Sequence, residues 1–160
     1  MSARVIRPLR VVAGASSGGH MNQLLRLLDA GGDWPAKPSV FVTTLSTVAS
    51  PLAARGPVHL VGECDRNHPL KALSVLFRSF RVAVKERPDV VITTGSLPLA
   101  MLCAWCKCLG ARIVWIDSVA NVDHLSMSGK FVRRFADLFL VQWPELEKKE
   151  PGTEYAGAIV

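Results

Sequence analysis

Residues 14–20 form the segment best suited to bind an anionic ligand, because small residues there lead from a predicted strand into a predicted helix. The small residues that could line a ligand are Ser16, Ser17, Gly18 and Gly19. They would let the backbone approach a phosphate, which the free N–H groups of a helix N-terminus bind well. A tight turn with close helix–sheet packing would explain the two glycines without a ligand. The segment matches neither the Gly-x-Gly-x-x-Gly nor the Walker pattern, so it predicts no standard dinucleotide or nucleoside triphosphate site.

Chemistry at these segments would come from side chains near the ends of predicted strands. His20, in the first helical turn, is a candidate general base or hydrogen-bond donor to a pyrophosphate, or else a histidine with no chemical role. Gly95 and Ser96 follow another strand, where Ser96 could cap a helix or face an anion. Asp117 ends a further strand and ranks above Asp123 as a base or hydroxyl acceptor. Turn formation would explain both aspartates equally well.

Residues 68–86 are predicted to form a basic amphipathic helix. Its apolar arc consists of Leu70, Leu73, Leu76, Phe77, Phe80, Ala83 and Val84, and its basic stripe of Lys71, Arg78, Arg81 and Lys85, with Val75 and Val82 at the stripe's far edge. One interpretation is a helix that packs its apolar arc on a sheet and leaves the basic side in solvent. The alternative places the basic stripe on anionic lipid headgroups, with the valines and phenylalanines entering the membrane surface.

Short β-branched runs alternate with helical stretches, which places the candidate loops in a defined framework. Strands are predicted at 9–13, 39–44, 58–62, 90–94, 113–117 and 138–142, and helices at 20–30, part of 46–55, 68–86, 97–109 and 127–136. The segment 144–154 is predicted to be a solvated surface segment before a last strand near 156–160. Most strands are continuously apolar, as in sheets buried on both faces. The order predicts an α/β fold, a Rossmann-like doubly wound parallel sheet whose ligands bind beyond the carboxyl ends of the strands.

Length and composition restrict the class of protein. The chain has 160 residues, 49% of them hydrophobic, and predicts one domain and no disorder. The net charge of +6, most of it before residue 88, suits an anionic partner or simple solubility. Cys103, Cys106 and Cys108 crowd one apolar segment, which favours buried thiols over a zinc site. No apolar run reaches the ~20 residues of a membrane span, so we expect a cytoplasmic protein or one attached to a membrane from the cytoplasmic side.

Four ordered motifs resemble the acceptor-side subunit of split glycosyltransferases. They are the run from Ser16 to His20, Thr94-Gly95-Ser96 with Pro98, Asp117-Ser118 followed by Ser128-Gly129-Lys130, and residues 136–146. That family includes the eukaryotic endoplasmic-reticulum subunit that recruits the catalytic half of the dolichol-pyrophosphate N-acetylglucosamine transferase, and bacterial counterparts in capsule and exopolysaccharide synthesis. The single-chain relative that adds N-acetylglucosamine to the peptidoglycan lipid precursor has a similar Gly-Gly-His loop.

The resemblance implies a GT-B fold divided between two chains. Residues 1–160 would form its N-terminal Rossmann-like half as a single domain and bind a polyprenyl-pyrophosphate-linked saccharide at the membrane. The nucleotide sugar would lie mainly on the other subunit. By position, the residues expected around the pyrophosphate or the reacting hydroxyl are Ser16, Ser17, Gly18, Gly19, His20, Gly95, Ser96 and Asp117.

We therefore predict a subunit of an inverting, nucleotide-sugar-dependent transferase for bacterial polysaccharide synthesis, inactive alone and peripheral on the inner face of the plasma membrane. His20 is the first candidate for base or acceptor clamp and Asp117 the second. We expect no metal, no cofactor and no nucleic-acid partner. The alternatives are a membrane-recruitment scaffold without a chemical role and, less favoured, a stand-alone nucleotide-binding enzyme of Rossmann type.

Overall fold

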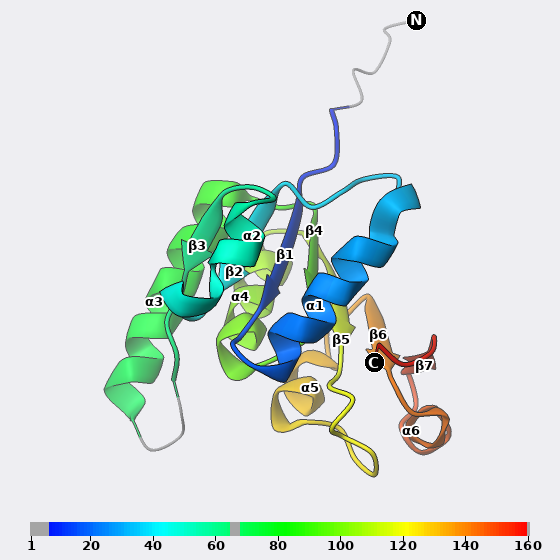
Figure 1. Cartoon of the computed structure of the whole chain (residues 1–160). Helices are drawn as coiled ribbons and strands as arrows, with labels where there is room; N and C mark the ends of the chain where they lie inside the picture. The colour runs from blue at the N-terminus through cyan, green and yellow to red at the C-terminus, as the bar shows by residue number, and fades with distance from the viewer. Residues whose placement is uncertain (1–6, 65–67, 160) are drawn as a thin grey trace, which may run out of the picture.

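Seven parallel strands form one sheet in the part of the chain that the computed structural model describes, residues 7–64 and 68–159 (Figure 1). The strands are β1 (Val11–Ala15), β2 (Val40–Thr43), β3 (Val58–Leu60), β4 (Val90–Thr93), β5 (Arg112–Ile116), β6 (Leu138–Val141) and β7 (Glu154–Tyr155). Their order is β3-β2-β1-β4-β5-β6-β7. The chain thus extends the sheet in one direction from β1 and then returns to extend it in the other from β4. This is the predicted doubly wound arrangement.

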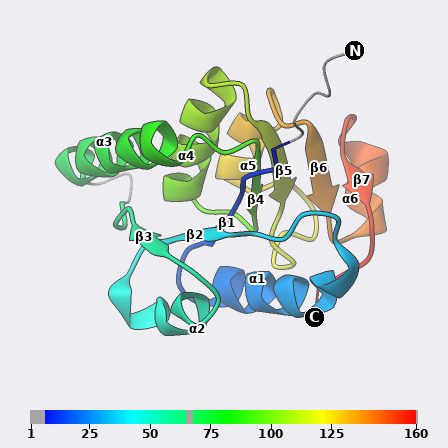
Figure 2. The ribbon, with the colours of Figure 1, turned by 90° about the horizontal axis from the view of Figure 1, so that it is seen from above.

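Helices cover both faces of the sheet. They are α1 (Gly19–Ala30), α2 (Ser50–Ala53), α3 (Pro69–Glu86), α4 (Leu97–Cys108), α5 (Met127–Val132) and α6 (Pro144–Lys149), with 3-10 turns η1 (Gly31–Asp33) and η2 (Ser46–Val48). Figure 2 shows α1 and α2 on one face and α3, α4 and α5 on the other. Every residue of β1 and β2 is buried, because helices cover both sides of these strands. The continuous apolar runs in the sequence correspond to this double burial.

The packing of α3 differs from the first of the two interpretations of its sequence. Its buried residues are Val75, Ser79, Val82 and Ala83. Large apolar side chains on the wider arc are exposed: Leu70 83%, Leu73 62%, Phe77 59%, Phe80 40% and Val84 37%. The narrow buried face packs against α4, where the Trp105 indole N–H donates to the Leu76 carbonyl oxygen at 3.2 Å. Apart from Ala83 and the half-buried Leu76, the apolar arc therefore does not pack in the interior, and the two valines cannot enter a membrane because they are buried.

The last third of the chain shows further differences from the predicted elements. The helix expected over 127–136 ends at Val132, and turns continue to Phe135. The segment from Pro144, expected to be wholly solvated, contains α6, which begins with proline and buries Leu146. The last strand is Glu154–Tyr155 and precedes the predicted position. In the described parts of the chain, no helix combines the length and apolar character needed to cross a bilayer.

Candidate active site

The loop after β1 meets the loop after β4 at the point where the strand order reverses. Such a reversal is where doubly wound sheets bind ligands, in the crevice beyond the carboxyl ends of the strands. Two hydrogen bonds join the loops: His20 Nδ1 lies 2.6 Å from the Thr94 carbonyl oxygen, and the Thr94 hydroxyl donates to the His20 carbonyl oxygen at 2.7 Å. The two segments that the sequence predicts to bind a ligand, residues 14–20 and Gly95 with Ser96, therefore lie next to each other.

The contact with Thr94 determines which nitrogen of His20 carries the proton. A carbonyl oxygen only accepts hydrogen bonds, so Nδ1 must donate. In the neutral imidazole, Nε2 then holds the free lone pair. Within the described residues Nε2 has no hydrogen-bond partner. The ring is thus oriented as a histidine base is, with one nitrogen fixed by the protein and the other available.

The two glycines before His20 are not explained by helix–sheet packing. A Cβ placed on Gly18 or Gly19 would have no heavy atom within 4 Å. Gly18 has a φ of 77°, which accounts for glycine at that position alone. Gly19 begins α1, and in the described chain neither the space around it nor its backbone conformation requires glycine there. Open space in front of a helix N-terminus is what a phosphate group needs.

Gly95 and Ser96 both have positive φ, at 114° and 102°. Glycine at position 95 is required, since a Cβ there would lie 3.1 Å from Cε1 of His20. Ser96 precedes α4 as predicted, yet its side chain makes no capping hydrogen bond. Its buried hydroxyl oxygen has no hydrogen-bond partner in the described structure. A non-glycine residue at positive φ marks local strain, which proteins retain mainly at functional positions.

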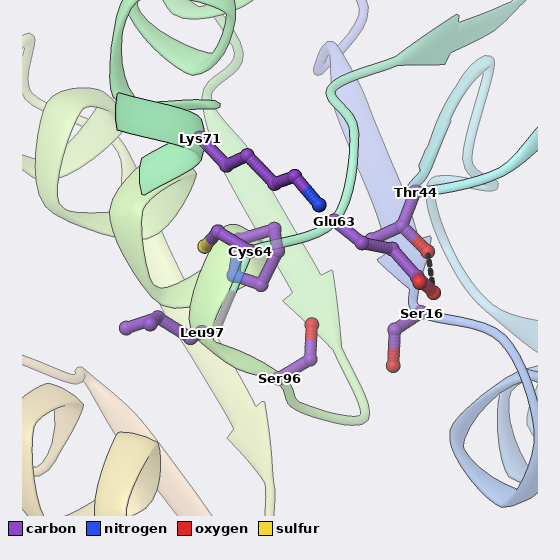
Figure 3. Close-up of a pocket in the computed structure, with 8 residues that line it drawn as sticks. Ser16, Thr44, Glu63, Cys64, Lys71, Ser96 and Leu97 are labelled. Atoms are coloured by element: carbon purple, nitrogen blue, oxygen red, sulfur yellow. Dashed lines mark hydrogen bonds between the residues drawn. The ribbon is translucent and has the colours of Figure 1, made fainter. Parts of the chain in front are cut away.

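A hollow of about 310 Å³ opens beside these loops (Figure 3). It is lined by Ser16, Thr44, Glu63, Cys64, Lys71, Ser96, Leu97 and Pro98. Glu63 Oε1 accepts hydrogen bonds from the Ser17 hydroxyl at 2.8 Å and the Thr44 hydroxyl at 3.2 Å. Sequence reasoning identified neither Glu63 nor Thr44 as a site residue, although Thr44 ends the strand predicted at 39–44 and Glu63 follows the strand predicted at 58–62. Ligands of such sheets bind at these strand ends.

Asp117 lies among groups that occupy its carboxylate. It is buried, and Ser126 donates to it twice, from the hydroxyl at 2.6 Å and from the backbone N–H at 2.8 Å. The Trp115 indole N–H and the Asn121 amide donate at 3.3 and 3.5 Å. Ser126 in turn caps α5 by accepting from the Gly129 N–H at 2.8 Å. The expected base at Asp117 is therefore replaced by the turn-forming alternative: its carboxylate fixes the loop that leads to α5.

The basic stripe of α3 divides between two places. Lys71 turns into the hollow of Figure 3, contrary to its predicted place on a membrane surface. Arg78, Arg81 and Lys85 line a wider, open hollow of about 560 Å³. In that hollow Nε2 of His59 lies 2.8 Å from Oε1 of Glu86, the one acidic residue of α3.

The clustered cysteines lie in α4, where Cys103 and Cys106 face the core as predicted and Cys108, at the end of the helix, is exposed instead. Burial raises the pKa of the Cys106 thiol to about 12. Burial, together with the neighbouring Cys106, also holds the pKa of the Cys103 thiol well above its usual range. Both side chains are therefore protonated thiols at neutral pH. Among residues 7–64 and 68–159, no three histidine, cysteine or acidic side chains gather as metal ligands would.

Solved structures of other proteins share this fold. MurG of Acinetobacter baumannii aligns with a TM-score of 0.67 at 14% identity, over 94% of this chain and 44% of its own. UDP-N-acetylglucosamine 2-epimerase of Rickettsia bellii aligns with a TM-score of 0.72 at 13% identity, over 96% and 46%. The chain thus spans less than half the length of these proteins. Its fold is that of a Rossmann-like domain of the GT-B type, as predicted.

Comparison with protein families identifies the group more closely. Residues 58–159 match the family described as oligosaccharide biosynthesis protein Alg14 like. The UDP-N-acetylglucosamine transferase subunit ALG14 of Yarrowia lipolytica is 31% identical over 90% of this chain and 78% of its own length. The mouse protein of the same name is 28% identical over 95% of this chain and 83% of its own length. The chain belongs to the Alg14 family.

Proposed function

We propose that this chain is the acceptor-binding half of a two-subunit, inverting glycosyltransferase. Its acceptor is a saccharide linked to a polyprenyl pyrophosphate, and a separate catalytic partner binds the nucleotide sugar. One observation supports the division: the chain is homologous to proteins named as transferase subunits. By analogy with the relatives' name, the donor is UDP-N-acetylglucosamine. The bacterial polysaccharide setting stays a prediction.

The acceptor's pyrophosphate binds at the start of α1. Backbone N–H groups of Gly19 and His20 have no acceptor in the described structure, and the space in front of the glycines is open. The positive end of the helix dipole adds to the attraction for a phosphate.

The orientation of His20 is the observation that carries the proposal. With Nδ1 bound to the Thr94 carbonyl oxygen, Nε2 is left available to a ligand, and His20 itself lies in the first turn of α1. In the transfer step the acceptor hydroxyl oxygen bonds to the anomeric carbon, and the bond from that carbon to the nucleoside diphosphate breaks. The hydroxyl proton passes to Nε2 of His20. Gly95 keeps the space that the imidazole occupies.

The chain attaches to the membrane through α3. Leu70, Leu73 and Phe77 are exposed on this helix, beside Arg78, Arg81 and Lys85. An apolar stripe flanked by basic side chains suits the headgroup region of an anionic bilayer, where each basic residue contributes about 1 kcal/mol. This keeps the phenylalanines of the predicted membrane contact but replaces the valines, which are buried, with leucines.

The test is sugar transfer by the chain purified together with its catalytic partner. The assay follows a radiolabelled sugar from the nucleotide donor onto extracted polyprenyl-pyrophosphate saccharide lipid. His20→Asn keeps a donor for the Thr94 carbonyl oxygen but removes the base, so kcat should fall roughly 100-fold or more while partner binding is unchanged. His59→Ala, at a histidine paired with Glu86 away from the site, is the matched control and should retain transfer. Unchanged turnover in His20→Asn would instead favour a recruitment scaffold.

A further inference from the structure

A carboxylate lies beside the loop that the proposed function assigns to a pyrophosphate. Glu63 is held there by Ser17 and Thr44, which both donate to Oε1. In the described structure Oε2 accepts no hydrogen bond, and the side chain is exposed toward the hollow of Figure 3. The protein thus fixes one oxygen of Glu63 and leaves the other available to a ligand.

The charge of Glu63 divides the site into two parts. A pyrophosphate placed in the hollow would be repelled by this carboxylate at short range, so the diphosphate belongs at the glycine side of the loop. Inside the hollow, Lys71 extends from α3 toward Glu63, and neither residue forms an ion pair within the described chain. One negative and one positive group make the hollow neutral overall. A neutral ligand rich in hydroxyl groups fits that balance.

The remaining lining of the hollow also suits a sugar. Ser16, Thr44 and Ser96 contribute hydroxyl groups, and that of Ser96 is buried without a partner in the described structure. Leu97 and Pro98 provide an apolar wall for the C–H groups of a pyranose ring. A volume of about 310 Å³ is at the lower end of the range for small-ligand pockets, which suits a single sugar unit.

We propose that the hollow binds the sugar of the acceptor that is attached to the pyrophosphate, with Glu63 Oε2 accepting a hydrogen bond from one of its hydroxyl groups. This inference rests on the proposed function, since it places the sugar next to the diphosphate site at Gly18 and Gly19. Glu63 is then a specificity residue: it distinguishes a sugar diphosphate from a diphosphate alone.

Two soluble probes separate these parts of the site: inorganic pyrophosphate and N-acetylglucosaminyl diphosphate. Titration calorimetry on the whole chain should give tighter binding of the sugar-bearing probe. In Glu63→Gln the amide oxygen accepts the hydrogen bonds from Ser17 and Thr44. The amide NH2 group, a donor, then faces the sugar in place of the acceptor oxygen Oε2. Binding of the sugar diphosphate should therefore fall roughly tenfold, whereas pyrophosphate should bind equally well or more tightly because a negative charge is gone. Glu145→Gln, at an exposed glutamate of α6, is the matched control and should change neither affinity.

Each other result overturns a defined part of the argument. If Glu63→Gln weakens both probes equally, Glu63 only shapes the loop, and the inference is wrong. The inference also fails if pyrophosphate binds as tightly as the sugar diphosphate to the unaltered chain. If the unaltered chain binds neither probe, the proposed function fails, and this inference with it. Thermal melting of both variants verifies that the fold is retained.

Discussion

Leu73 and Phe77, two exposed side chains of the apolar arc of α3, can be replaced without disturbing the core, because neither is part of it. Leu73 and Phe77 are 62% and 59% exposed, whereas Val75 between them is buried. We predict that the double variant Leu73→Ser, Phe77→Ser keeps its fold and loses most of its affinity for anionic vesicles. The two substitutions test which side of α3 contacts the membrane.

The magnitude follows from the exposed fractions. Fully burying a leucine or phenylalanine is worth about 1.5–3 kcal/mol, so completing the burial of a side chain that is roughly three-fifths exposed yields about 1–2 kcal/mol. Together the two side chains contribute about 2–4 kcal/mol to membrane binding. At 1.4 kcal/mol per factor of ten, binding should weaken by at least about 25-fold. The melting temperature should change little, since neither side chain is part of the core.

The assay is co-sedimentation with vesicles of phosphatidylcholine and phosphatidylglycerol, and with vesicles of phosphatidylcholine alone. The control variant Leu9→Ser, Tyr155→Ser removes two other exposed apolar side chains, which lie outside α3, and should bind as the unaltered chain does. Equal vesicle binding by the α3 variant and the unaltered chain would refute the assigned membrane face. A large fall in melting temperature would refute the packing direction of α3.

Two further predictions concern strain and pH. Gly95→Ala and Gly110→Ala should each cost about 1–2 kcal/mol of stability, because both glycines have positive φ. Only Gly95→Ala should also abolish transfer by displacing His20; equal loss of transfer in both variants would contradict this. Asp137 is subject to burial, which raises its pKa, but hydrogen bonds from Lys107 and the Ile113 N–H outweigh it and hold the pKa below 3.8. An aspartate whose pKa is lowered by folding stabilises the fold at pH values above its pKa in the unfolded chain. Asp137→Asn should therefore lower the free energy of unfolding, measured in urea at neutral pH, by about 1 kcal/mol. That difference should vanish as the pH falls through the folded pKa.

The sheet and its loops were predictable because the signals are local. The continuous apolar run in β1 indicates a strand buried on both faces, and loops that contain glycine follow β1 and β4 in the sequence. Parallel strands then bring those loops to one edge of the sheet, which placed His20 near Gly95 without any knowledge of side-chain positions.

The direction of α3 and the role of Glu63 could not be predicted in this way. A wide apolar arc usually faces the core, yet here the narrow face with Val75 and Ala83 packs against α4 and the rest of the molecule. Glu63 accepts a hydrogen bond from Ser17, which lies 46 residues earlier in the sequence. Glu63 itself follows β3, a strand of only three residues. Such long-range contacts carry no periodicity, so a single sequence does not reveal them.

The position of Lys71 has a consequence for how the proposed polyprenyl-linked acceptor would be bound. This residue belongs to the helix that carries the exposed leucines, and its side chain extends toward Glu63 in the hollow, so the two features are neighbours. A bilayer resting on α3 would therefore present its headgroup layer almost at the mouth of the hollow. Drawing a long hydrocarbon tail into water costs about 0.8 kcal/mol for each methylene. Because the hollow lies so close to the lipid, the tail can stay dissolved among its neighbours while only the polar head leaves the leaflet.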